Sequence, residues 1–218
     1  MKYFTQTILA ASLLLFSCSG SGDGEKAKTD SSTTTKAEAK PEAAPATAPD
    51  TAAMNKAWAE FMTPGAMHKW MEKTNGTWEA DLTQWIDPKA PPMKSKATIV
   101  QNSVLGGRYV TSKYTGTMMG APFEGMSTMG YDNAKKIFVS TWIDNVGTGM
   151  VNMTGTYNEA TKTLSLRGTQ TNPMNGKDGN IREEMSMVDD DTYTMVMYGD
   201  DYAGKEMKFM EATVKRKK

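Results

Sequence analysis

The side chains that most often carry nucleophilic or metal chemistry are scarce in this sequence. One cysteine, Cys18, and one histidine, His68, occur among 218 residues. A single cysteine excludes an internal disulfide and every multi-cysteine metal site, and a single histidine excludes zinc motifs built on histidine pairs. A serine or cysteine triad also needs an imidazole, and His68 falls in a predicted helix rather than on a strand. We therefore expect a protein that is not an enzyme.

The sequence also contains no feature that indicates binding of phosphate groups or nucleic acid. No P-loop or dinucleotide fingerprint occurs, and the glycines are spaced as turns. The acidic runs 189–191 and 200–201 also fall in predicted turns, where solvated turn residues are the default interpretation. The 25 Lys and Arg residues balance 25 Asp and Glu residues, so there is no basic excess to neutralise phosphates. We expect no cofactor and no nucleic-acid partner.

Methionine is the unusual residue type, at 19 of 218 positions. Met185 and Met187 share one face of a predicted strand, and Met195 and Met197 share one face of the next. A three-residue turn at 189–191 would pair Met185 with Met195 and place all four on one face, whereas a two-residue turn would separate the pairs. We interpret these residues as core or cavity lining. Binding of Cu(I) by the soft thioethers and a protective oxidation sink are the alternatives.

Arginine and aromatic residues on predicted strands are the candidates to contact a ligand. A guanidinium group matches the geometry of a carboxylate, so an arginine in a partly polar interior would orient an amphipathic ligand. Solvated arginines are the alternative for each taken singly. The segment 137–144 has apolar residues on both faces, so its inner face is not identified by hydrophobicity. The candidates for ligand binding are Arg108, Tyr114, Trp142, Arg167, Arg182 and Tyr198.

The N-terminal residues predict export and anchoring. Residues 8–16 are mostly apolar and follow Lys2, but they are too few to span a bilayer, which needs about 20, so residues 1–17 are a predicted signal peptide. Leu15 and Ser17 before Cys18 resemble the bacterial lipobox, which implies lipidation of Cys18 and a membrane anchor. Ser19 replaces the aspartate that signals inner-membrane retention, so the resemblance implies the outer membrane of a bacterial envelope. An ordinary secretory signal is the alternative.

Residues 18–53 are predicted to be the lipidated cysteine and a disordered tether. They contain no aromatic residue and are rich in Ser, Thr, Lys, Glu, Ala and Pro, so they cannot bury enough apolar surface to fold. The predicted folded domain is 54–218. Apolar residues at helical spacing predict a helix near 54–61, and Thr63 before a proline predicts the N-cap of a second helix that ends at Gly76. His68 in that helix is interpreted as a helix-surface or helix–barrel contact, with a lone haem ligand as the alternative.

From residue 77 the apolar pattern alternates with a period of two, and nine turn signals separate ten strand-like segments. Short connections make neighbouring strands antiparallel, and closure would remove the exposed edges of so long a meander. We predict a mainly β fold: an up-and-down barrel of about ten strands with a short helical N-terminal cap. A two-sheet sandwich is the alternative.

Several motifs in the predicted domain resemble those of known families. Gly76-Thr77-Trp78 is similar to the G-x-W signature of lipocalins, and this resemblance implies that Arg216 packs over Trp78 by a cation–π contact. The stretches 90–93, 105–108, 122–125, 130–133 and 140–144 together resemble the bacterial family called domain of unknown function 1579, over roughly residues 64–216. That family has no assigned function, but the resemblance supports a barrel.

We therefore expect an envelope lipoprotein that binds or carries a small apolar or amphipathic ligand in its barrel. The alternatives are a structural or interaction lipoprotein with a filled barrel, whose protein partner is unknown, and Cu(I) binding by the methionines.

Overall fold

The computed structural model describes residues 50–87, 90–201 and 203–218. The predicted signal peptide, Cys18 and residues 19–49 lie outside this part of the chain. Two helices, α1 (Thr51–Met62) and α2 (Ala66–Glu72), precede ten strands. The strands are β1 (Gly76–Gln84), β2 (Met93–Val104), β3 (Tyr109–Met118), β4 (Ala121–Asp132), β5 (Ile137–Asp144), β6 (Val151–Asn158), β7 (Thr163–Thr171), β8 (Asp178–Asp189), β9 (Thr192–Asp200) and β10 (Glu206–Arg216).

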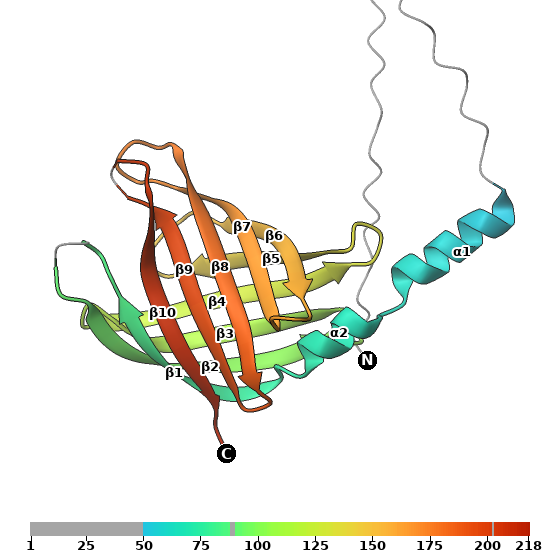
Figure 1. Cartoon of the computed structure of the whole chain (residues 1–218), viewed down its shortest axis with the longest axis horizontal. Coiled ribbons are helices and arrows are strands. Elements are labelled where there is room, and N and C mark those ends of the chain that lie inside the picture. The colour runs from blue at the N-terminus through green and yellow to red at the C-terminus, as the bar shows by residue number, and fades with distance from the viewer. Residues whose placement is uncertain (1–49, 88–89, 202) are drawn as a thin grey trace, which may run out of the picture. The chain divides into compact units, whose positions relative to one another are not determined.

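Each strand pairs antiparallel with its neighbours in the sequence, and β1 also pairs with β10, which closes the sheet into a barrel (Figure 1). The closing register runs from Trp78 opposite Arg216 to Gln84 opposite Met210. Closure removes the free edges that an open ten-stranded meander would expose. The predicted up-and-down barrel is confirmed, and the two-sheet alternative is wrong.

Inward-facing and outward-facing side chains alternate along the strands, as the pleat requires. On β7, Leu164 is buried and Arg167 is exposed. On β5, whose two faces look alike in the sequence, Phe138 and Ser140 are buried. Pairing with β4 places Ser140 opposite Met129, which packs against the core. The register of the neighbouring strand therefore selects the inner face of β5.

Helix α2 closes one end of the barrel. Trp70 packs against Phe138 and Tyr157, with ring centroids 5.4 and 4.6 Å apart, and Met71 is almost completely buried. The N-cap of α2 is Gly65. The prediction that Thr63 caps this helix is therefore wrong.

Thr63 is instead the C-cap of helix α1. Its hydroxyl donates a hydrogen bond to the Ala59 carbonyl at 2.7 Å. Residues 51–53, which the predicted tether included, form the first turn of α1. No residue of α1 is buried, so its apolar stripe does not pack on the barrel as a lid. Asn133 links the end of α1 to the barrel by donating to the Thr63 carbonyl at 2.8 Å. No described helix is long and apolar enough to cross a membrane.

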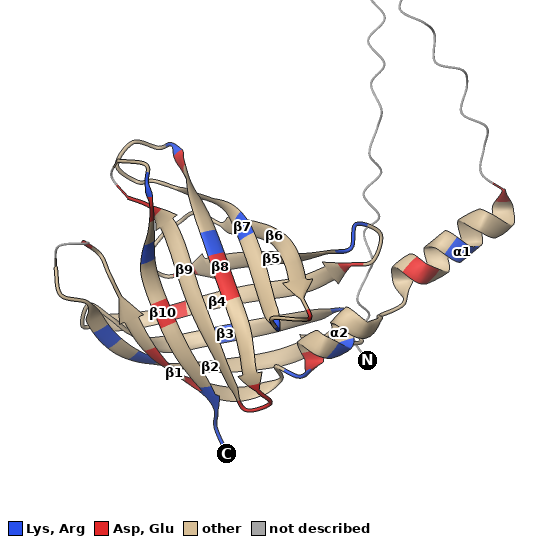
Figure 2. Cartoon of the chain, viewed as in Figure 1, with Lys and Arg blue, Asp and Glu red and all other residues tan. Residues whose placement is uncertain are grey.

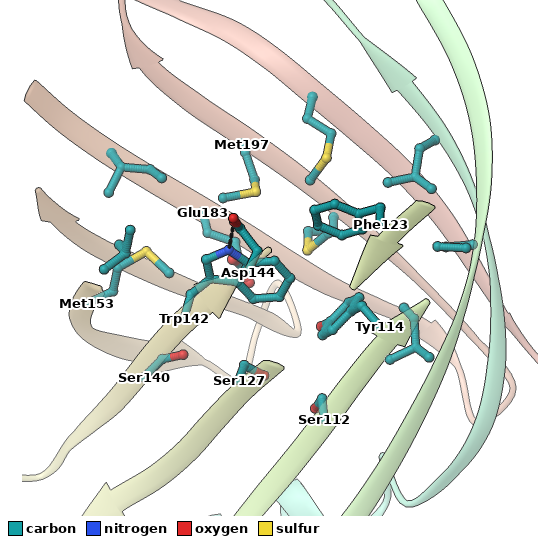
Figure 3. A pocket seen from close by; sticks show the side chains of 18 of the residues that line it. Ser112, Tyr114, Phe123, Ser127, Ser140, Trp142, Asp144, Met153, Glu183 and Met197 are labelled. Atoms are coloured by element: carbon teal, nitrogen blue, oxygen red, sulfur yellow. Dashed lines mark hydrogen bonds between the residues drawn. The ribbon is translucent and has the colours of Figure 1, made fainter. Parts of the chain in front are cut away.

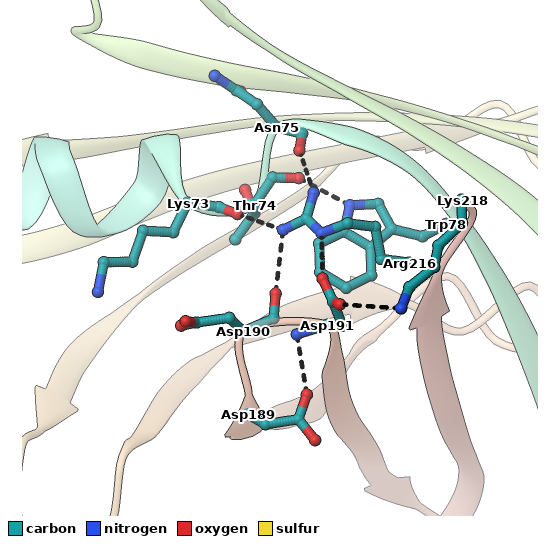
Figure 4. Close-up of polar contacts among 9 residues, drawn as sticks. All are labelled: Lys73, Thr74, Asn75, Trp78, Asp189, Asp190, Asp191, Arg216 and Lys218. Carbon is teal, nitrogen blue, oxygen red and sulfur yellow. Dashed lines mark hydrogen bonds and ion pairs between the residues drawn. The ribbon is translucent and has the colours of Figure 1, made fainter.

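A clamp around Trp78 holds the chain before β1 against the end of β10 (Figure 4). The indole is buried, and its Nε1 donates to the Thr74 carbonyl at 2.8 Å. The Arg216 guanidinium lies 4.1 Å from the ring centroid and donates to the carbonyls of Lys73 and Asn75. The cation–π contact that the G-x-W resemblance implied is therefore present.

Gly76 leaves space for this clamp. Its φ of 125° is one that residues with a Cβ rarely adopt, and a Cβ would lie 2.9 Å from an Arg216 nitrogen. A glycine is therefore needed at position 76, two residues before the clamped Trp78.

Candidate functional site

The barrel encloses a cavity of about 810 Å³. Trp70 and Met71 of α2 border it at one end, and residues 146–150 and Pro173 border it at the other, where it opens to solvent. This volume is typical of pockets that hold a small organic ligand. The barrel is therefore hollow and not filled by its own side chains.

Most of the cavity wall is apolar. Trp142 forms an aromatic group with Tyr114 and Phe123, whose ring centroids lie 4.9 and 6.3 Å from its own. Methionine, with its flexible thioether, supplies much of the remaining surface and suits a cavity that adapts to its occupant. The methionines that line the cavity are Met71, Met118, Met129, Met150, Met153, Met185, Met195, Met197 and Met210.

Hydroxyl groups from neighbouring strands form a polar strip on one wall. Ser112 on β3 lies opposite Ser127 on β4, and both are hydrogen-bonded to the Tyr114 hydroxyl. Burial and then the nearby charge of Glu183 raise the pKa of Tyr114 well above its ordinary value. Tyr114 therefore remains a neutral hydroxyl. It is available for hydrogen bonding within the cavity.

A second tyrosine lies deeper in the barrel. The Tyr193 hydroxyl accepts a hydrogen bond from the Gln101 side-chain amide at 3.1 Å, and its ring packs on Trp78 with centroids 5.1 Å apart. Burial raises the pKa of Tyr193 well above its ordinary value, with contributions from Tyr114 and Glu183. This hydroxyl too is neutral.

Glu183 is the ionisable group with the most unusual surroundings. It lies on the inner face of β8 between Ile181 and Met185, opposite Met197 of β9 (Figure 3). Its side chain is only half-buried because it borders the cavity, but the barrel encloses it. Burial raises the pKa of its carboxyl from the ordinary 4.5 to about 7. Within the described part of the chain, no hydrogen bond or ion pair to its carboxylate is found, and its oxygens face the cavity.

Asp144, the other acid on the inner face, differs from Glu183 because its oxygens are occupied. One oxygen accepts from the Trp142 indole at 2.7 Å, and the other accepts from the backbone of Val146 and Gly147 at 2.9 and 3.0 Å. These bonds fix the Trp142 ring and the loop at the open end. Asp144 is thus part of the wall's structure.

The methionine hairpin has the pairing that a three-residue turn predicts. Met185 lies opposite Met195, and all four residues, Met185, Met187, Met195 and Met197, belong to the core or pack against it. A bulge between Met187 and Asp189 keeps this register. No group of three or more His, Cys, Asp or Glu residues suited to a metal ion occurs in the described residues.

His68 lies between α2 and the barrel, outside the cavity lining. Its Nδ1 accepts from the Gly65 backbone N–H at 3.0 Å, its ring packs edge-on against Tyr131, and it is hydrogen-bonded to the Tyr131 backbone. Desolvation lowers its pKa, so the neutral ring is favoured. These contacts match the interpretation as a helix–barrel residue.

Of the six residues expected to contact a ligand, Tyr114 and Trp142 line the cavity. Arg108 lies in the turn before β3 and donates to the Met62 carbonyl at 2.7 Å. Arg167 and Tyr198 occupy outward positions on β7 and β9. The structure therefore does not bring Arg108, Arg167, Arg182 or Tyr198 to the cavity.

Arg182 is held on the outer surface by its neighbours. It donates to both oxygens of Glu206 at 2.9 Å, pairs with Glu184, and lies 3.7 Å from the centroid of the Tyr198 ring. Figure 2 shows that basic and acidic residues adjoin on β8 and that both kinds also occur on β10. The Arg182 guanidinium therefore has its hydrogen-bond and charge partners on the outer surface and does not enter the barrel.

Glu183 is an ionisable cavity residue that was not among the candidates predicted from the sequence. Its signal is the alternation in β8: Ile181, Met185 and Met187 share the apolar face, and Glu183 is the acid among them. An acid in the inward register of a strand marks either an ion pair or a polar site inside the protein.

Comparisons with known proteins bear on fold and family. The crystal structure of Rv2717c from M. tuberculosis is similar to this structure, with a TM-score of 0.56 and 12% sequence identity. The similarity covers 72% of this chain and 100% of Rv2717c. A redesigned beta barrel covers 71% of this chain and 100% of its own, with a TM-score of 0.39 and 14% identity. The first likeness supports the fold alone. No match is found among curated proteins.

The sequence pattern of one family matches most of the barrel domain, over residues 63–216. That family is described as "Protein of unknown function (DUF1579)". The chain therefore belongs to the DUF1579 family.

Proposed function

We propose that this protein is a non-enzymatic lipoprotein of the bacterial cell envelope whose barrel binds or carries a small apolar or amphipathic ligand. The observation that carries the proposal is the cavity of about 810 Å³, whose lining is mostly apolar, includes nine methionines and six aromatic residues, and is open at one end. Such a surface releases water when it takes up an apolar molecule. Its few hydroxyls and carboxylates would orient the ligand.

The rim of the open end also favours exchange with an apolar phase. Several loops there expose large apolar side chains: Ile86, Met119, Val146, Met150 and Met174. A lipid anchor on Cys18 would keep the barrel near a membrane from which a hydrophobic ligand could transfer. The outer membrane is the proposed location.

Native mass spectrometry of the gently purified protein tests ligand binding. We expect an additional mass that disappears on denaturation and corresponds to a small amphipathic molecule. A bare polypeptide, together with no uptake of added apolar probes, would refute the proposal and favour a structural or interaction lipoprotein. The hollow interior argues against that alternative.

Cu(I) binding is the second candidate, because Met185 lies opposite Met195 and Met197 lines the same cavity. Thioether clusters select soft cations. Titration with silver ion, compared between the protein and its Met185→Leu and Met197→Leu variants, tests it. Saturable binding that either variant weakens would support it, and its absence would refute it.

A further inference from the structure

We propose that the cavity selects amphipathic amines: molecules with an ammonium head group and an apolar body, whose head group binds to the Glu183 carboxylate. This inference rests on the proposed function, because it specifies the chemical class of the ligand. Three features of the cavity favour such a ligand: the position of Glu183, its unused hydrogen-bonding capacity, and the sign of the other charges.

Glu183 points into the interior from the middle of β8. The residues paired with it are Leu166 on β7 and Met197 on β9, so its lateral neighbours offer it no hydrogen bond. Glu184, the next residue, faces outward and pairs with Arg182. A carboxylate that is enclosed without a donor costs free energy, and a ligand that brings a donor would recover it.

The charges that face the cavity are negative. Among the described residues that line it, Asp144 and Glu183 are the acids, and neither arginine nor histidine is present. Lys96 also borders the cavity, but its ammonium group is exposed and pairs with Asp81 at 2.7 Å. The interior therefore favours a cation and disfavours a carboxylate head group.

The remaining polar groups can complete a head-group site. Strand β3 lies five strands from β8 in either direction around the barrel, so the Tyr114 hydroxyl faces Glu183 from the opposite wall. Tyr193 on β9 and Asp144 on β5 are the other titratable groups on the inner face. Tyr114 and Tyr193 are neutral, and Asp144 already accepts three hydrogen bonds, so Glu183 is the acceptor left for an ammonium group.

Probes that share one alkyl chain and differ in the head group test this selectivity. We would measure the affinity of the purified protein for octylamine, octanol and octanoate by calorimetry at about pH 8, where a carboxyl with a pKa of about 7 is mainly ionised. We expect octylamine to bind at least about tenfold more tightly than octanol, the scale of one charged hydrogen bond, and octanoate to bind most weakly.

The matched variants are Glu183→Gln inside the barrel and Glu184→Gln outside it. Glu183→Gln should reduce octylamine affinity about tenfold or more, leave octanol affinity nearly unchanged and not weaken octanoate. Glu184→Gln should leave all three affinities unchanged. The ranking of probes on the unmodified protein tests the selectivity even if a variant does not fold.

The outcomes separate this inference from the proposed function. Equal binding of the three probes, or tighter binding of octanoate, would overturn the selectivity for amines while leaving a general apolar carrier. An octylamine preference that survives Glu183→Gln would overturn the role of Glu183. Failure of all three probes to bind would refute the proposed function itself.

Discussion

Replacing Glu183 by glutamine should make the barrel more stable at neutral and alkaline pH. The carboxyl has an ordinary pKa of 4.5 in the unfolded chain, and burial raises it to about 7 in the fold. Between these values the folded protein binds more protons than the unfolded chain, so the contribution of Glu183 to the free energy of unfolding falls as pH rises. That loss is complete above the folded pKa. Glutamine has a similar shape and does not titrate.

The magnitude follows from the same shift. One pKa unit corresponds to about 1.4 kcal/mol, so the difference between 4.5 and about 7 corresponds to about 3 kcal/mol. Because the cavity is open to solvent, water reaching the carboxylate reduces this value, and we expect Glu183→Gln to stabilise the fold by about 1–3 kcal/mol at about pH 8. At about pH 4, where the carboxyl is mainly protonated in both states, the two proteins should differ by less than about 0.5 kcal/mol.

Urea unfolding followed by tryptophan fluorescence measures this difference at several pH values. Glu184→Gln is the matched control, because it removes an outward-facing carboxylate from the same strand. Other titrating groups contribute equally to the parent and the variant, so the quantity of interest is the change in their difference with pH. A Glu183→Gln protein that is less stable than the parent at about pH 8, or a difference that does not vary with pH, would refute the reasoning.

Three further predictions test the clamp, the strand packing and the anchor. Arg216→Ala should lower the free energy of unfolding by about 2–4 kcal/mol in a urea titration, because the cation–π contact and several hydrogen bonds are lost together; an unchanged midpoint would contradict this role. Gly155→Ala should destabilise the fold by at least about 1–3 kcal/mol, because a Cβ there would overlap the backbone of Ser165. Gly149→Ala, with open space around it, is the control in the same unfolding measurement, and equal effects would argue against a close approach of β6 and β7. Cys18→Ser should move the protein out of the membrane fraction after lysis, and continued co-sedimentation with washed membranes would refute the lipid anchor.

Local features of the sequence were sufficient to predict the barrel and part of its register. Turn signals at regular spacing delimit ten strands, and their short connections force an antiparallel meander, so closure between β1 and β10 follows from the cost of free edges. The sequence left open whether Met185 pairs with Met195, and the bulge between Met187 and Asp189 decides that they do. The G-x-W resemblance anticipated the Trp78–Arg216 contact.

The candidate site was less predictable, because several of its features depend on contacts between distant segments. Both faces of β5 carry apolar side chains, and its inner face is set by the register against β4. Arg182 stays outside because Tyr198 and Glu206, from other strands, satisfy its charge there. That the barrel is hollow depends on how the side chains of all ten strands fill its interior.

The sequence by itself thus determined the number of strands and their antiparallel order, since turn length and a two-residue period are local properties of the chain, and it favoured closure over a two-sheet sandwich. Only the tertiary structure decided what lies inside the barrel. The sequence places Glu183 on the same strand face as Ile181 and Met185. Its carboxylate lacks a hydrogen-bond partner because the residues paired with it, Leu166 and Met197, offer no donor. Burial and charge pairing are properties of the assembled wall, and they make this carboxylate the centre of the candidate site.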